Sequence, residues 1–268
     1  MNIKRLAVIF IAVIFVVVTA FSSVAIFTVK QIDLSYSVLE GEVSNPSAVK
    51  KQLDSNYVGK NLLFLDEEDV VESLKDDYYL EVLSVDKQYP NVLKVSVKER
   101  LAVYAVNYGG EYYYATKDGF VVEKVSSFTQ TRDIIELDLS GFATANVTVG
   151  QNITTDDDEL LLSLFEMAKA INLTDCVKSI SVENVTEFTV VSFKTYTGVE
   201  IKIDVTPDYN TANGQPVVLE PSKASIAFYA YDTLLTDYQK SYGVLDLLRM
   251  KDGRYRVTYN NQEIYTAE

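Results

Sequence analysis

The side chains that could carry out chemistry in this 268-residue chain are mainly carboxylates. The sequence has 38 acidic residues, no histidine, no tryptophan and one cysteine, Cys176. These counts exclude a serine–histidine–aspartate triad, a cysteine–histidine pair, a histidine zinc site and a CxxC redox pair. Paired carboxylates are the only plentiful acid–base groups that remain. An enzyme built on them needs two acidic groups in one pocket, with raised pKa values and a separation suited to glycoside chemistry.

One run of carboxylates, Asp156-Asp157-Asp158-Glu159, has the composition of a calcium loop. It lacks the glycine and the ligand spacing of an EF-hand, so we interpret it as the cap and dipole partner of a helix over Thr155–Ile171. Cys176 cannot form an intramolecular disulfide, and we interpret it as a small core residue. We therefore expect no metal, no cofactor and no enzymatic activity.

The net charge of −14 limits the classes of partner. Binding to nucleic acid depends on basic residues that neutralise phosphates, and a globular part lying flat on anionic lipid needs basic residues as well. The composition instead favours an acidic, exported region that binds other proteins.

The N-terminus predicts a membrane anchor. Residues 1–5 form a short basic tail, and the apolar stretch over residues 6–28 is long enough to cross a hydrocarbon core of about 30 Å as a helix. Lys4 and Arg5 favour a cytoplasmic N-terminus, with the remaining chain outside. The alternative is a cleaved signal peptide, because Ser23-Val24-Ala25 offers small residues at a cleavage site. Both interpretations export most of the chain.

Residues 79–100 predict a β-hairpin. Leu93, Val95 and Val97 alternate with polar residues, which is the period of a strand with one buried face. The segment Tyr89-Pro90-Asn91-Val92 places proline and asparagine where a tight turn favours them.

The residues before this hairpin predict one strand and two helices. Residues 28–36 alternate as a strand, and Asn45-Pro46 starts a helix that ends at Gly59. Residues 66–77 predict a second helix with an acidic N-terminus. The order strand, helix, helix, strand, strand predicts a three-stranded sheet with two helices on one face, over residues 29–100.

Residues 101–268 predict a mostly β domain with two flanking helices, so the fold class as a whole is α+β. The helices are expected over Thr155–Ile171 and Ser222–Tyr242. Strand patterns fall at residues 103–106, 112–115, 120–122, 134–139, 177–182, 188–193, 199–205, 244–247 and 255–259. We expect the strand Tyr255–Tyr259 to close the domain at a sheet edge, where another chain can add a strand.

The first unit resembles a POTRA domain, and the whole chain resembles the FtsQ/DivIB family of bacterial cell-division proteins. Besides the basic tail and the apolar stretch, the resemblance is carried by three segments: Gly59–Phe64, Leu83–Pro90 and Val95–Arg100. It implies a non-enzymatic scaffold at the division septum. The implied partners are two small bitopic coiled-coil proteins of the FtsB/DivIC and FtsL type and, through them, the septal peptidoglycan synthase.

The family's partner-binding region corresponds to the last helix and strands of this chain. The resemblance makes five residues contact candidates, while the same pattern is equally typical of sheet core and rim: Leu247, Arg249, Tyr255, Val257 and Tyr259. Two other functions remain open at this point. One is a membrane-anchored cell-wall enzyme with paired carboxylates. The other is a POTRA chaperone outside division, which for an outer-membrane barrel needs many further strands.

Overall fold

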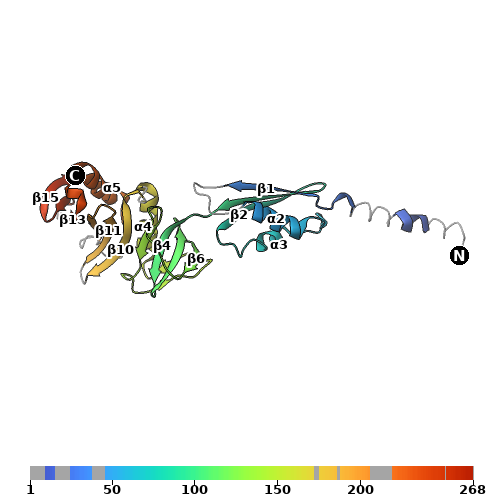
Figure 1. The fold of residues 1–268 in the computed structure, drawn as a ribbon, viewed down its shortest axis with the longest axis horizontal. Coiled ribbons are helices and arrows are strands. Elements are labelled where there is room, and N and C mark those ends of the chain that lie inside the picture. The colour runs from blue at the N-terminus through green and yellow to red at the C-terminus, as the bar shows by residue number, and fades with distance from the viewer. Residues whose placement is uncertain are drawn as a thin grey trace. The chain divides into compact units, whose positions relative to one another are not determined.

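The computed structural model describes residues 10–15, 25–37, 46–171, 175–185, 188–205, 219–250 and 252–267. The chain divides into two compact units, residues 1–100 and 101–268, shown in blue to green and in green to red (Figure 1). Most of the membrane helix expected over residues 6–28 lies outside the described residues. Among the residues that are described, no helix combines the length and the apolar character needed to cross a membrane.

The first unit has the predicted order of elements. Its elements are β1 (Gln31–Ser37), α2 (Pro46–Tyr57), α3 (Glu67–Glu72), β2 (Leu80–Gln88) and β3 (Val92–Glu99). The sheet order is β1-β3-β2, with β1 parallel and β2 antiparallel to β3. Figure 1 shows α2 and α3 on the same side of this sheet. The predicted three-stranded sheet with two helices is therefore confirmed.

Alternation in β3 explains how the first unit packs. Leu93, Val95 and Val97 are fully buried, and they share a core with Leu53 of α2 and Val70 of α3. Each buried aliphatic side chain contributes about 1.5–3 kcal/mol relative to exposure.

The helix α3 is shorter than the predicted range of residues 66–77. Asp66 is its N-cap, and the side chain accepts a hydrogen bond of 3.0 Å from the backbone N–H of Glu68. After Glu72 the chain forms tighter turns, in which the backbone N–H of Lys75 donates to the carbonyl oxygen of Glu72. Continuing the helix through Asp76 and Asp77 would place negative charge at its C-terminal end, where the helix dipole disfavours it.

The second unit is built on a ten-stranded sheet with the order β15-β14-β13-β12-β11-β10-β7-β4-β5-β6. The strands are β4 (Ala102–Tyr108), β5 (Glu111–Thr116), β6 (Val121–Val125), β7 (Ile135–Asp138), β10 (Val177–Val185), β11 (Phe188–Thr195), β12 (Glu200–Asp204), β13 (Val244–Arg249), β14 (Tyr255–Tyr259) and β15 (Gln262–Ala267). A separate small sheet pairs β8 (Ala145–Asn146) with β9 (Thr154–Thr155).

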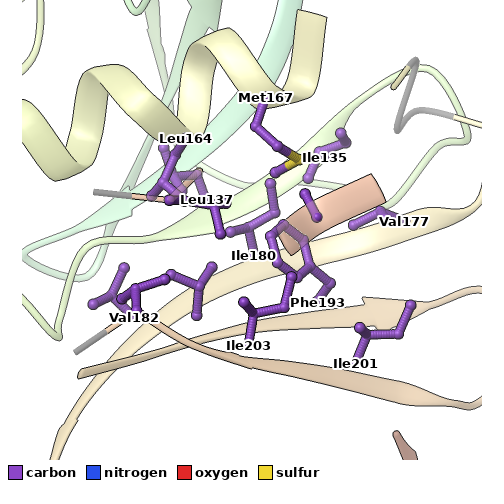
Figure 2. Packing of buried hydrophobic residues seen from close by; sticks show 14 of the residues in the cluster. Ile135, Leu137, Leu164, Met167, Val177, Ile180, Val182, Phe193, Ile201 and Ile203 are labelled. Atoms are coloured by element: carbon purple, nitrogen blue, oxygen red, sulfur yellow. The ribbon is translucent and has the colours of Figure 1, made fainter. Parts of the chain in front are cut away.

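Two helices, α4 (Asp158–Ile171) and α5 (Pro221–Tyr229), contribute to the core of the second unit. Figure 2 shows Leu164 and Met167 of α4 packed over Leu137, Ile180 and Phe193 from three strands. The ring of Phe193 also lies 5.5 Å from the ring of Phe228 in α5. The predicted class, a mostly β domain with two helices, is therefore confirmed.

The predicted helix over Ser222–Tyr242 is wrong in its second half. The helix α5 ends at Tyr229 and continues as a π-helical turn only to Leu234, after which Leu235 is extended. A new turn then starts at Thr236, whose backbone N–H donates to Oε1 of Gln239 at 3.0 Å. This side-chain bond satisfies an end group that a continuous helix would pair internally.

The expectation that Tyr255–Tyr259 closes the sheet at its edge is also wrong. This strand, β14, pairs with β13 on one side and with β15 on the other. Among the described residues the edge belongs to β15 instead, and pairing on both sides satisfies the backbone hydrogen-bonding groups of β14.

Candidate functional site

The strand β15 is one end of the ten-stranded sheet. It pairs antiparallel with β14, which leaves the backbone groups on its other side without a strand partner in the described part of the chain. Its sequence, QEIYTA, contains neither the lysine nor the proline that commonly protect an edge. Gln262, Glu263 and Tyr265 are exposed. The edge is therefore open to pairing with an added strand.

The turn before β15 is a two-residue hairpin turn with positive φ at both residues, 47° at Asn260 and 65° at Asn261. Asparagine tolerates this backbone region, and two such residues are typical of a type I′ turn. The Asn260 side chain accepts a 3.0 Å hydrogen bond from the N–H of Val244, the first residue of β13. This contact ties the hairpin of β14 and β15 to the next strand of the sheet.

The side chain of Tyr259, in β14, also holds this hairpin against the rest of the domain. Its hydroxyl lies 2.8 Å from the carbonyl oxygen of Tyr242 and 3.0 Å from that of Gln239. Both acceptors belong to the segment between α5 and β13. Tyr259 therefore has a structural role that its exposure of 7% agrees with.

The five residues named from the sequence lie on neighbouring strands, but they differ in accessibility. Leu247 and Val257 face each other across β13 and β14, and both are core residues. Arg249 is exposed and lies in register with the half-buried Tyr255. All five residues therefore lie on β14 and β13, the second and third strands counted from the β15 edge.

Sequence reasoning missed the residues of the edge itself. Tyr265 of β15 lies 6.3 Å from Tyr229 of α5, measured between ring centroids, and both side chains are exposed. Ile264 is partly buried against the core. The signal that could have found this strand is Asn260-Asn261 between two strand-like runs, because paired residues that tolerate positive φ mark a hairpin.

Charged groups surround Tyr255 on the helix-covered side of the sheet. Lys223 of α5 lies 5.9 Å from the Tyr255 ring and 4.0 Å from the Glu220 carboxylate. Burial lowers the pKa of Lys223, and the positive charge of Arg249 lowers it further, while Glu220 raises it. Burial, followed by the charge of Glu220, raises the pKa of Tyr255. Two cations (Lys223 and Arg249), the Glu220 carboxylate and the Tyr255 phenol therefore lie close together where α5 passes the end of β13.

The sequence left open an enzyme with paired carboxylates, and Asp246, on the other face of the sheet, is the carboxylate to examine for this role. Burial raises the pKa of Asp246, and nearby Lys202 lowers it. Lys202 also lies 3.9 Å from Glu200 and 3.4 Å from Glu183. This is a mixed network of ion pairs rather than an isolated pair of acids. Among the described residues, no group of three or more His, Cys, Asp or Glu side chains is arranged to hold a metal ion.

In the three-stranded and ten-stranded sheets of the described residues, three other strands are edges as well. In the second unit, the opposite edge is β6, where Val121 exchanges backbone hydrogen bonds with Gly150 and Gln151, so a loop covers its first residue. In the first unit, β1 and β2 are both edges. The strand β2 has a bulge near Leu83, a feature that disrupts regular pairing.

The fold and these edges define a class: a POTRA unit followed by a large, mostly antiparallel sheet with an open terminal strand. Residues 42–100 match the family model described as "POTRA domain, FtsQ-type". The chain is 26% identical over 157 residues to "Cell division protein DivIB" of Clostridium botulinum strain Hall, and the match covers 59% of the chain and 58% of that relative.

A second DivIB, from Clostridium acetobutylicum, is 26% identical over 157 residues, which are 58% of the chain and 60% of that relative. The matched region thus spans somewhat less than two thirds of these curated relatives. Together with the POTRA domain of FtsQ type, these matches support a relationship to the FtsQ/DivIB family of cell-division proteins.

Proposed function

We propose that the chain is a non-enzymatic scaffold of the bacterial division machinery that docks other membrane proteins at the septum. Similarity to DivIB proteins and to the FtsQ-type POTRA domain supports the division role, and the open edge at β15 is the observation that carries the docking role. In this proposal residues 1–5 are cytoplasmic, residues 6–28 cross the membrane, and the POTRA and C-terminal domains lie outside. The partners are small bitopic coiled-coil proteins of the FtsB/DivIC and FtsL type, which connect the scaffold to septal peptidoglycan synthesis.

The proposed contact is strand addition to β15. Main-chain hydrogen bonds from an added strand supply affinity, and side chains beside the edge supply register. Tyr229 and Tyr265 provide an exposed aromatic surface next to that strand. Arg249 and Tyr255 form a second group of contacts at the ends of β13 and β14. Leu247, Val257 and Tyr259 act from behind by holding these strands in place.

The test uses proline at two successive positions of β15, Tyr265→Pro and Thr266→Pro. Because N–H groups of a strand alternate in direction, one substitution removes a bond to β14 and the other removes only an outward donor. We expect the outward variant to keep the thermal midpoint of the full-length protein and to lose co-purification with the two bitopic partners.

The matched control places proline at Glu123 and Lys124 of β6, the other end of the same sheet. At least one of these variants should retain both stability and partner binding. The docking proposal is wrong if the β15 variant that keeps its thermal midpoint also keeps partner binding, or if the β6 variants weaken binding instead.

A further inference from the structure

One end of the first unit carries a cluster of exposed apolar side chains. We call it the apolar tip and define it by five residues: Ile26, Val58, Leu63, Phe64 and Tyr89. Phe64 is 83% exposed, the highest value among the large apolar side chains of the described residues. A cluster of this kind commonly marks an interaction site, whereas single exposed apolar residues do not.

The apolar tip joins three segments that are distant in sequence. The backbone N–H of Leu62 donates to the carbonyl oxygen of Phe27 at 2.7 Å, and that of Val29 donates to Lys60 at 2.8 Å. Lys30 donates in the same way to Asn91 in the hairpin turn, at 2.9 Å. Residues 26–30, 58–64 and 89–91 are therefore fastened together at this end by main-chain bonds.

The side chains of the apolar tip are exposed although their neighbours in sequence reach the core. Leu62 and Leu65 on either side of the exposed pair are buried in the core of the first unit. Leu63 and Phe64 point outward between them, because the N–H of Leu63 bonds to Oδ1 of Asn61 at 2.9 Å and fixes a turn. The ring of Phe27 also meets that of Tyr89 edge-on, with 5.8 Å between centroids.

The apolar stretch over residues 6–28 ends in this same cluster. Thr28 forms a β-bridge with Asn61, so the last residues of that stretch lie beside the loop that carries Phe64. If the stretch crosses a membrane, the tip lies within a few residues of the bilayer surface. Exposed Lys30 and Lys60 flank it, and Lys60 sits 4.6 Å from the Tyr57 ring centroid.

We propose that the apolar tip is a membrane contact, in which Phe64, Leu63 and Tyr89 insert into the interface between lipid headgroups and acyl chains. This inference rests on the membrane anchor of the proposed function. Aromatic rings favour that interface, and basic residues beside it reach lipid phosphates. The exposed carboxylates of Asp66, Glu67 and Glu68 follow directly, which keeps the contact shallow and favours zwitterionic over anionic lipid.

The test uses the absence of tryptophan from the chain. Phe64→Trp places a single indole at the tip of the full-length protein, which is reconstituted into phosphatidylcholine vesicles with and without brominated acyl chains. Tyr78→Trp is the matched control, since Tyr78 is also exposed but lies before β2, while Tyr89 follows it. The nine-residue strand separates these two ends by roughly 30 Å.

We expect a blue-shifted emission maximum and a loss of intensity in brominated vesicles for Phe64→Trp, and neither change for Tyr78→Trp. Adding Leu63→Gln to Phe64→Trp should reduce the loss. Equal quenching of the two tryptophans by bromine overturns the inference. So does a blue shift at position 64 without bromine quenching, which indicates contact with a second copy of the chain.

Flotation of the same vesicles separates the two proposals. A protein that floats with the vesicles but shows no quenching at position 64 keeps the anchor and loses the tip contact. A protein that does not float loses both.

Discussion

The Tyr259 hydroxyl lies 2.8 Å from the carbonyl oxygen of Tyr242, and this contact joins the strand next to the open edge to the segment that precedes β13. The edge strand β15 is held by β14, and β14 is held in part by this bond. The position of the candidate docking edge thus depends on residues that the partner does not touch.

Tyr259→Phe removes the hydroxyl and leaves the ring in place. We expect the second unit to lose about 1 kcal/mol of unfolding free energy, the usual net value of one internal hydrogen bond. Urea denaturation measures the loss. Tyr265→Phe is the control, because its ring is exposed and the change should be close to zero. Equal effects of the two variants would contradict the role given to Tyr259.

Sequence patterns predicted the first unit well because its turns are local. Pro90 and Asn91 mark the hairpin, and the alternation through Leu93 to Val97 sets its buried face. The α+β class and α4 also follow from local periodicity. The sheet of the second unit does not, because β7 pairs between β4 and β10, strands that are distant in sequence. Such pairings are decided by burial and chain connection, which no short pattern contains.

The candidate edge was located in the correct region but on the wrong strand. The turn Asn260-Asn261 marks a hairpin, but Ile264-Tyr265 breaks the simple alternation that marks a strand with one wet face. The bulge between Val257 and Thr258 shifts the register of the same pair. Both features hide β15 from a period-two search.

Gly243→Ala should destabilise the hairpin junction. Gly243 has φ of +102°, and an added Cβ would lie 2.7 Å from Oδ1 of Asn260. We expect a loss of about 1–3 kcal/mol from backbone strain and crowding, measured by urea denaturation. Gly253→Ala is the matched control, since φ is +88° there but nothing lies within 4 Å of the added Cβ. The difference between the two variants isolates the clash, and a difference of zero would rule the clash out.

Glu99→Met should stabilise the first unit. Glu99 is 1% exposed, and neither carboxylate oxygen has a hydrogen-bond partner in the described part of the chain. Methionine has a similar length and removes the cost of an unpaired buried polar group, about 1–3 kcal/mol. Thermal unfolding of the full-length protein measures the gain. A clear loss of stability would show that the carboxylate makes a bond of its own.

Asp246→Asn tests the raised pKa of this carboxylate. A raised folded-state pKa means that the folded protein favours the protonated form, so stability falls as pH rises from the ordinary aspartate value of about 3.9 through the folded value. Asparagine mimics the neutral form. We expect the variant to be more stable than the parent at pH 7, with the gain disappearing below about pH 4. A gain that persists unchanged in acid would contradict burial as its cause.

Disulfide scanning of β15 tests the docking proposal most directly. The single native thiol, whose pKa burial raises to about 11, is first replaced by Cys176→Ala. Cysteines are then placed one at a time at positions 262–267 of the full-length protein and along the bitopic partners. Strand addition predicts an ordered set of cross-links, in which moving one residue along β15 moves the partner position by one. Cross-links in no register, or cross-links that form only from β6 or from the POTRA edges, would contradict it.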